Sequence, residues 1–415
     1  MSPQQPWTVR PVADEDWEVF RDVDAHAFGV AMVEEQEAAE RELHGSARDI
    51  GAYDAEELVG IATAFPFRLA VPGAALPAAG VSWVGVLPTH RRRGVLRALM
   101  THQLHSVHEE GTEPLAILWA SEPQIYGRFG YGLANRAYSM TVPRSDRALH
   151  ASVPNDPGLR TRLVDPKAWK ELAPVYEAVA ETRPGVPLRD EAWWQRAVQD
   201  LPALRGGKSP LRCVVAEDGD AIRGYALYAT KQFWDESFGK GQVTASEVMA
   251  TDPAALATLY RYLFDLDLMG STTLDHVPVD DPLVHWLSNP RSAKPVLQDC
   301  LYVRLVDLPR ALTARSYATD LDVVLEVTDE ICPWNAGTWR LTATTGPTPD
   351  ATCEPTDDEA DISLDIVHLG AVYLGGMALT ELALAGGPVE RRPGALAATT
   401  AAFAHFPAPW TPWIF

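Results

Sequence analysis

Three consecutive arginines lie where a strand-like run gives way to a helical pattern. The apolar run Val81–Val86 is followed by a proline-containing bend and then by Arg91-Arg92-Arg93-Gly94. The first N–H groups of a helix attract anions, and arginine side chains add bidentate contacts to phosphate. The spacing fits neither the G-x-G-x-x-G dinucleotide motif nor a G-K-S/T triphosphate loop. The bend is therefore predicted to bind an anion of another kind, although these residues alone also fit a solvated basic turn.

A second run places a tyrosine and several glycines directly after another strand. Leu115–Trp119 is apolar and strand-like, and Ser121-Glu122-Pro123 is typical of a helix start. Tyr126 and the Gly-rich turn Phe129-Gly130-Tyr131-Gly132 come next. The pattern alone leaves open that Tyr126 only packs in this turn.

Aromatic residues also end the chain. Trp410, Trp413, Ile414 and Phe415 all lie in the tail, and no charged side chain follows Arg392. Disordered tails seldom concentrate aromatic residues, so this tail is predicted to pack against the protein. The residues alone allow a tail that packs for stability and has no further role.

The elements that must position these residues alternate between strand and helix, which favours a layered α/β or α+β fold. Apolar positions at helical spacing predict helices over 14–28, 31–43 and 95–107. Short β-type runs predict strands over 49–53, 57–66, 81–86 and 115–119, and the small residues at 72–80 predict a bend.

Prolines and other turn-forming residues near positions 150 and 290 indicate domain boundaries. They predict domains over 1–150, 151–290 and 291–415. In the middle one, two strands flank the hairpin signal Asp218-Gly219-Asp220, and Asp252-Pro253 opens a helix over 254–268. Asp252 would repel a phosphate at the start of this helix, so the bend between strand and helix in the middle domain is predicted to bind no anion. In the last domain, strands are predicted over 301–305, 321–327 and 338–344, and helices over 362–370, 378–384 and 394–403.

The composition of the chain limits the classes of function that it can have. The 415 residues include 56 acidic and 35 basic side chains, a net charge of −21, which opposes binding to nucleic acid and to anionic membranes. The first residues lack a basic stretch followed by an apolar one, so no secretory signal is expected. Apolar stretches are interrupted before they could span a bilayer. The four cysteines show neither C-x-x-C spacing nor paired histidines, so no metal site is expected. These features predict a cytoplasmic protein.

The arginine run resembles the core signature of the GNAT superfamily of acetyltransferases, R/Q-x-x-G-x-G/A, read here as Arg91-Arg92-Arg93-Gly94-Val95-Leu96 with Leu96 in place of the final small residue. Together with the Tyr126 run and the segment 361–376, it is similar to the Eis (enhanced intracellular survival) branch. The resemblance implies an α+β protein with tandem GNAT-type mixed-sheet domains, the second degenerate, followed by a sterol-carrier-like α/β domain.

The resemblance also implies an N-acetyltransferase that uses acetyl-CoA as co-substrate and forms a homo-oligomer, commonly a hexamer. It implies Tyr126 as general acid and the terminal carboxylate of Phe415 as general base. Direct attack in a ternary complex is expected, with amines of aminoglycosides, lysines or polyamines as acceptors. The implied donor-binding residues are Val84, Gly85, Val86, Arg91, Arg92, Arg93, Gly94, Val95, Leu96, Arg97, Ser121 and Glu122.

The resemblance also implies that the acceptor channel borders the first helices, with His26, Phe28 and Trp83 expected on it. Aromatic and acidic side chains there would attract an ammonium group. The Glu-rich helix over 31–43 also fits a solvated face. Two alternatives stay open for the whole chain. One is a lipid or small-molecule carrier with a vestigial acetyltransferase domain, and the other is an acyltransferase for longer acyl-CoA donors.

Overall fold

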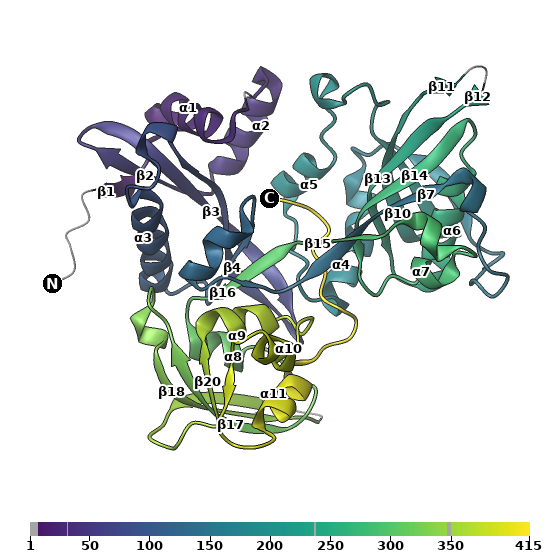
Figure 1. Cartoon of the computed structure of the whole chain (residues 1–415). Coiled ribbons are helices and arrows are strands. Elements are labelled where there is room, and N and C mark those ends of the chain that lie inside the picture. Colours follow the sequence, from purple (N-terminus) through teal and green to yellow (C-terminus); the bar gives the residue numbers. More distant parts are fainter. Residues whose placement is uncertain (1–6, 31, 236–237, 347–349) are drawn as a thin grey trace. The chain divides into compact units, whose positions relative to one another are not determined.

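The computed structural model describes residues 7–30, 32–235, 238–346 and 350–415, and they form two compact units (Figure 1). The first unit comprises the chain up to Asn135, Cys300–Pro409 and Phe415. The second comprises Arg136–Asp299 and Trp410–Ile414. The boundaries expected near residues 150 and 290 stay predictions about folding domains.

The first unit contains a seven-stranded mixed sheet in the order β1-β2-β3-β4-β5-β16-β6. The pair β4–β5 is parallel, and the other neighbours are antiparallel. The four strands predicted before residue 120 are confirmed. The strands are β1 (Thr8–Pro11), β2 (Arg48–Asp54), β3 (Glu57–Val71), β4 (Ala74–Val86), β5 (Leu115–Trp119), β6 (Gly132–Leu133) and β16 (Leu301–Leu305).

The bend predicted over 72–80 is wrong, because most of it belongs to β4. Gly73 turns the chain with a φ of +78°, and β4 then pairs back along β3 from Ala74 onward. Its alanines are small enough to be buried in the sheet, where Ala78 and Ala79 are fully covered. Cross-strand pairing therefore decides this segment over its turn-like composition.

Helices cover both faces of this sheet. They are α1 (Trp17–Phe28), α2 (Glu34–His44) and α3 (Val95–Glu110), close to the predicted ranges. Phe20 of α1 packs in a cluster with Tyr53 and Ile61, whereas Leu99 of α3 packs in a cluster with Ala52 and Ala62. Neighbouring residues of a strand point to opposite faces, so α1 and α3 lie on opposite sides of the sheet.

A five-stranded sheet, in the order β19-β18-β17-β20-β21, completes the first unit. The helix predicted over 362–370 is half wrong, because Ile362–Asp365 forms β20 and pairs with β17. The helix starts only after Asp365, whose side chain accepts from the Val367 N–H at 3.0 Å. The elements are α8 (Leu308–Thr313), β17 (Leu321–Thr328), β18 (Gly337–Thr344), β19 (Asp350–Pro355), β20, α9 (Ile366–Val372), α10 (Leu379–Leu384), β21 (Val389–Glu390) and α11 (Ala395–Phe403).

The second unit repeats the plan with a seven-stranded sheet, β15-β7-β14-β13-β10-β9-β8, in which β13 and β14 are parallel. The hairpin predicted around Asp218-Gly219 is confirmed as β9–β10. The elements are β7 (Arg136–Pro143), β8 (Arg160–Val164), α4 (Ala173–Thr182), α5 (Glu191–Ala197), β9 (Arg212–Asp218), β10 (Ala221–Lys231), β11 (Trp234–Asp235), β12 (Phe238–Gly239), β13 (Gly241–Ala250), α6 (Pro253–Asp265), β14 (Met269–Pro278), α7 (Leu283–Trp286) and β15 (Val296–Asp299).

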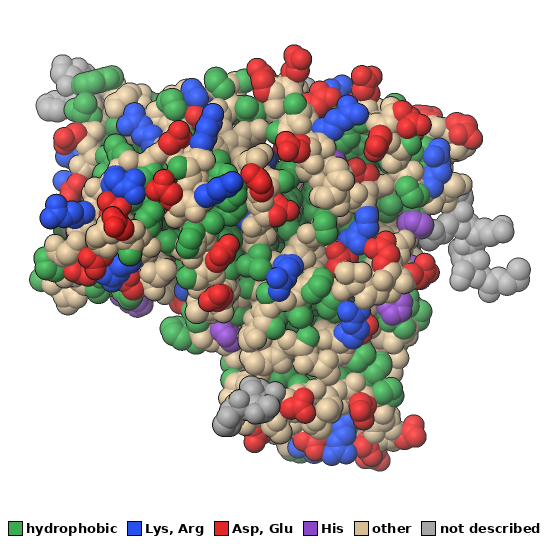
Figure 2. Space-filling model, turned by 180° about the vertical axis from the view of Figure 1, so that it is seen from behind, with side chains coloured by type: hydrophobic (Ala, Val, Ile, Leu, Met, Phe, Trp, Pro, Cys, Tyr) green, Lys and Arg blue, Asp and Glu red, His purple; other side chains and the backbone are tan. Residues whose placement is uncertain are grey.

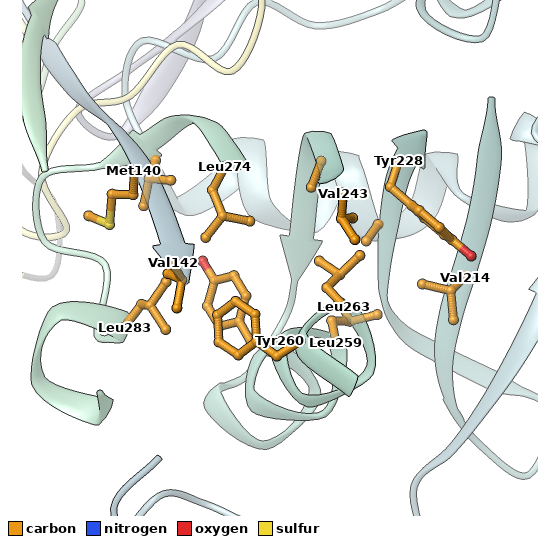
Figure 3. Close-up of a cluster of buried hydrophobic side chains, with 14 of the residues drawn as sticks. Met140, Val142, Val214, Tyr228, Val243, Leu259, Tyr260, Leu263, Leu274 and Leu283 are labelled. Carbon is orange, nitrogen blue, oxygen red and sulfur yellow. The ribbon is translucent and has the colours of Figure 1, made fainter. Parts of the chain in front are cut away.

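Helix α6 supplies much of the second unit's core. Tyr260 of α6 faces Val142 of β7 and Leu274 of β14, and Leu263 of α6 lies beside Val243 of β13, in one buried apolar cluster (Figure 3). The predicted start of this helix is confirmed, because the Asp252 side chain accepts from the first N–H groups of α6 at 2.9 and 3.1 Å. A carboxylate therefore already occupies the helix end where an anion would bind.

The surface is mixed in charge. Acidic and basic side chains are interspersed over the face seen in Figure 2, with apolar residues between them. None of the helices in the described part of the chain combines the length and the apolar character that crossing a bilayer requires.

Candidate functional site

The site begins where two parallel strands separate. β4 and β5 pair from Ala78 to Val81 on β4, and beyond Val81 the strand β4 stays paired with β3 alone. The backbone of Val84–Val86 therefore presents an edge toward the space that β5 leaves. A Cβ on Gly85 would lie 3.0 Å from the Ala27 side chain, so glycine lets the end of α1 approach this edge closely.

The start of α3 is the second component. Gly94 precedes the helix with a φ of +90°, and no side chain caps the first turn. Arg92 also has a positive φ, +61°, which a side chain adopts at a cost. The bend thus delivers the chain into a helix whose first N–H groups stay available to an anion.

These components line a cleft of about 800 Å³. Four arginines and one glutamate contribute to its wall, so a locally basic site lies within a strongly acidic protein. The lining residues are Ala27, Phe28, Val84, Gly85, Val86, His90, Arg91, Arg92, Gly94, Val95, Leu96, Arg97, Ser121, Glu122, Ile125, Tyr126, Arg128 and Phe129.

Two of these arginines contact residues that lie outside the bend. Arg91 donates to the Ala27 carbonyl at 2.8 Å, which ties the bend to the end of α1. Arg97 pairs with Glu330 at 2.7 Å, and both side chains remain more than half exposed. A pair this exposed contributes little to stability, so the Arg97 guanidinium can turn toward a stronger anion in the cleft.

Tyr126 lies in the cleft wall, in the short 3-10 helix Pro123–Phe129. Burial and then the charge of Glu122 raise the pKa of its hydroxyl to about 12. The group therefore keeps its proton throughout the neutral range and can donate a hydrogen bond to a negative atom. Its ring meets the Tyr131 ring edge to face at 6.1 Å.

Thirteen of the seventeen residues predicted for the site line the cleft, whereas Arg93, His26, Trp83 and Phe415 do not. The Arg93 guanidinium lies 4.9 Å from the centre of the Trp7 ring instead. The His26 ring is 2.7 Å from the carbonyl of Asp22, within its own helix.

Trp83 packs in an aromatic cluster rather than in the cleft wall. Its ring lies 4.7 Å from His44, 5.9 Å from Phe20 and 6.1 Å from Trp17. Its φ is +53°, at the point where the pairing of β4 with β3 shifts by a residue. A bulge of this kind turns a side chain away from the regular alternation of a strand.

Phe415 lies near the strand that forms the cleft edge. The Ser82 hydroxyl, two residues before Val84, donates to a Phe415 oxygen at 3.1 Å. The Phe415 ring also meets the Phe67 ring edge to face at 4.8 Å. The predicted packing of the tail is confirmed, since Trp410 and Thr411 are buried as well.

Sequence reasoning missed five residues that line the cleft: Ala27, His90, Ile125, Arg128 and Phe129. Four of them lie inside the arginine run and the Tyr126 run, from which the site was predicted. Arg128 could have been predicted as a phosphate-binding residue, because it is basic and lies close to Tyr126 in the sequence. Ala27 carried no such signal. Within the described ranges, no three His, Cys, Asp or Glu side chains are grouped as a metal site requires.

Comparison with known proteins agrees with this architecture. Two families described as "Acetyltransferase (GNAT) domain" match residues 8–134 and 185–305, and a "Sterol carrier protein domain" family matches 308–412. An uncharacterised N-acetyltransferase of Streptomyces avermitilis is 43% identical, over 97% of this chain and 98% of its own.

Relatives with a family name are also similar. The N-acetyltransferase Eis of Mycobacterium bovis is 38% identical over 81% of this chain and 80% of its own. The crystal structure of Eis1 from Mycobacterium abscessus is 32% identical with a TM-score of 0.83, over 98% of this chain and 100% of its own. A GNAT protein from Anabaena variabilis shares the fold, with a TM-score of 0.84 at 20% identity over 99% of this chain and 100% of its own. The chain therefore belongs to the Eis family of GNAT enzymes and is an acetyl-CoA-dependent N-acetyltransferase with a sterol-carrier-like C-terminal domain.

Proposed function

We propose that this enzyme transfers the acetyl group of acetyl-CoA to primary amines of aminoglycosides, lysine side chains or polyamines. The observation that carries the proposal is the cleft of about 800 Å³, which combines the uncapped start of α3, a free strand edge, four arginines and Tyr126. This donor set matches a long thioester substrate that ends in phosphates, because N–H groups and guanidinium groups both favour phosphate oxygens.

The donor would lie along β4 and end at α3. The backbone of Val84–Val86 would bind the pantetheine arm, and the N–H groups from Arg92 to Arg97 would bind the pyrophosphate. The Arg93 side chain is engaged with Trp7, so its contribution would come from the backbone. Ser121 and Glu122 would border the reacting end.

The chemistry requires one bond to form and one to break. The amine nitrogen attacks the thioester carbon, the C–N bond forms, and the C–S bond breaks without a covalent enzyme intermediate. Tyr126 donates a hydrogen bond to the departing sulfur. A carboxylate with a pKa near 3.5 is too weak a base for an ammonium with a pKa near 10. The Phe415 carboxylate therefore takes the proton after attack, from the nitrogen of the tetrahedral intermediate.

The acceptor would approach from the side of α1. Phe28 is in the cleft wall, while Trp83 belongs to the aromatic cluster and His26 is exposed. Aromatic faces attract ammonium groups by cation–π interaction, which suits a polyamine acceptor. The second unit would bind no donor, because Asp252 caps the helix end that corresponds to the start of α3.

A thiol-release assay with acetyl-CoA tests the proposal. The panel should contain an aminoglycoside, a lysyl peptide and a polyamine, with propionyl-CoA and longer donors compared in parallel. Release above the enzyme-free blank for at least one amine supports the proposal. Release equal to the blank for every amine, together with tight lipid binding, would favour the carrier alternative. Light scattering tests the expected hexamer, and cell fractionation tests the expected cytoplasmic location.

A further inference from the structure

Trp83 has a backbone conformation that a large side chain rarely adopts. Its φ of +53° lies in the left-handed region, where the Cβ of any residue other than glycine crowds the backbone. Such a conformation persists only where the surrounding structure holds it, and conformations of this kind gather at functional sites. The side chains around Trp83 are therefore expected to maintain it.

This residue lies at the point where β4 becomes a free edge. The pairing of β4 with β5 ends at Val81. The pairing with β3 shifts directly afterwards, so that Trp83 and Val84 together oppose the single residue Ala62. A bulge of this kind bends the strand and increases its twist. The conformation of Trp83 therefore sets the direction in which the backbone of Val84–Val86 faces the cleft.

Side chains from α1 and α2 surround the indole ring of Trp83. Phe20 stacks on it with ring centres 5.9 Å apart, Trp17 lies at 6.1 Å, and His44 meets it edge to face at 4.7 Å. These three side chains are buried, whereas Trp83 is half-buried. Because closely packed side chains leave few alternative positions, they hold the indole in one place.

His44 is the member of this aromatic cluster that hydrogen bonds fix to the sheet. Its Nδ1 lies 2.8 and 2.9 Å from the two carboxylate oxygens of Asp49, and the Thr63 hydroxyl donates to the same carboxylate at 2.7 Å. Asp49 and Thr63 are direct partners on β2 and β3. The His44 side chain is only 3% exposed. These bonds tie the end of α2 to the sheet and set the plane of the imidazole ring.

The other ring nitrogen of His44 has no such bond. Within the part of the chain that the structure describes, its Nε2 is buried and has no hydrogen-bond partner. A buried polar atom without a partner is unfavourable and calls for an explanation. An aliphatic side chain would avoid that cost, but it could not bond to Asp49 and present a ring edge to Trp83 at the same time.

We propose that His44, held by Asp49, is a positioning residue for the donor-binding edge, because it keeps Trp83 in its left-handed conformation and so fixes the bulge before Val84–Val86. The inference rests on the proposed binding of acetyl-CoA along that edge, and all of these residues belong to the first unit. His44 does not line the cleft, so its effect on the donor passes through Trp83.

Substitutions at Trp83 separate its backbone conformation from its packing. Alanine and glycine both remove the indole, but glycine adopts a positive φ readily and asparagine tolerates one better than most residues do. Trp83→Ala is expected to weaken coenzyme A binding about 5- to 30-fold in calorimetric titration, the range that a left-handed residue costs. Trp83→Gly and Trp83→Asn are expected to stay within about threefold of the wild type. Equal losses for alanine, glycine and asparagine would overturn the proposal.

A second substitution tests the part of His44. His44→Ala is expected to weaken coenzyme A binding about 3- to 10-fold, the range that an aromatic contact contributes. In the Trp83→Gly protein the same change should cause no further loss, since glycine needs no neighbour to hold its φ. An equal loss in both backgrounds would show that His44 acts independently of Trp83 and would refute the proposal. If His44→Ala does not fold, His44→Asn replaces it, because its amide can still bond to Asp49 while the ring is absent.

Leu268 provides the matched control. It also has a positive φ, +64°, but it belongs to the second unit and is 51% exposed. Leu268→Ala and Leu268→Gly should therefore both bind coenzyme A as the wild type does. A loss in Leu268→Ala as large as that in Trp83→Ala would indicate a general effect on the protein and would contradict the proposal.

A crystal structure of His44→Ala shows the conformation of Trp83 without any donor. The expected result is a changed φ at Trp83 and a changed path of Val84–Val86. An unchanged φ would disprove the role of His44, even if the wild type binds coenzyme A. If the wild type binds no coenzyme A while the φ of Trp83 changes in the variant, the proposed donor site fails and the role of His44 in holding the bulge stands.

Discussion

Replacing Tyr126 by phenylalanine removes one hydroxyl from the wall of the cleft and is expected to slow acetyl transfer without weakening donor binding. Burial and the charge of Glu122 raise the pKa of this hydroxyl to about 12. A thiol has a pKa near 8.5, so complete proton transfer from Tyr126 to the leaving thiolate would be uphill by roughly 5 kcal/mol. The hydroxyl therefore acts as a hydrogen-bond donor that keeps its proton.

The size of the effect follows from this role. A hydrogen bond to a charged atom contributes about 1.5–3 kcal/mol, so Tyr126→Phe is expected to lower kcat by roughly 10- to 150-fold. KM for acetyl-CoA should stay close to that of the wild type, because the hydrogen bond strengthens only as charge develops on sulfur. Since the raised pKa keeps Tyr126 protonated below about pH 12, its ionisation should cause no loss of wild-type kcat up to about pH 10.

Steady-state kinetics by thiol release, over a pH series, measures both quantities. Tyr131→Phe is the matched control, because Tyr131 is 1% exposed and its hydroxyl has no hydrogen-bond partner among the residues described. That variant should retain kcat. If Tyr126→Phe also keeps kcat within about threefold of the wild type, the hydroxyl has no part in transfer and Tyr126 only packs.

Three other perturbations test separate features. Gly94→Ala should weaken coenzyme A binding about tenfold in calorimetric titration, because its φ of +90° costs a side chain about 1–2 kcal/mol at the start of α3; unchanged affinity would contradict this. Arg304→Met should lower the free energy of urea unfolding by about 3–5 kcal/mol, because it leaves the fully buried carboxylate of Asp329 uncompensated. The same change at Arg340, whose side chain is 47% exposed, should cost under about 1 kcal/mol, and equal losses would refute the burial argument. Burial raises the pKa of Asp24 to about 6, so its contribution to the free energy of unfolding is present below about pH 4 and is lost as the pH rises through 6. The Asp24→Asn variant should therefore become more stable relative to the wild type as the pH rises over that window. A constant difference in stability between pH 4 and 7 would contradict this.

Local signals predicted much of the cleft. Helix α3 begins after Gly94, and helix α6 begins after the capping carboxylate of Asp252, with a proline at its first position. The sequence predicts both starts because capping preferences act between residues only a few positions apart. The arginine and tyrosine runs pointed to one site for the same reason. Each run joins a strand to a helical turn, and the residues between must lie at the same edge of the sheet.

The sequence pattern did not predict the directions in which the side chains point. Arg93 and Trp83 are adjacent in sequence to residues of the cleft, yet one contacts Trp7 and the other an aromatic cluster. The bulge in β4 and the positive φ of Trp83 reverse the alternation that a regular strand would show. No spacing rule specifies such a reversal, because it depends on what packs against the strand.

The amino-acid sequence by itself determined the class of protein, the start of α3 with its basic bend, the capped and therefore different start of α6, and the aromatic character of the tail. Only the tertiary structure decided that β16 lies between β5 and β6, that Ile362–Asp365 is a strand, and that the tail is held by the second unit up to Ile414. Capping and periodicity act between near neighbours in the chain. Strand pairing and burial depend on partners that are far away in the sequence and are found only when the whole chain has folded.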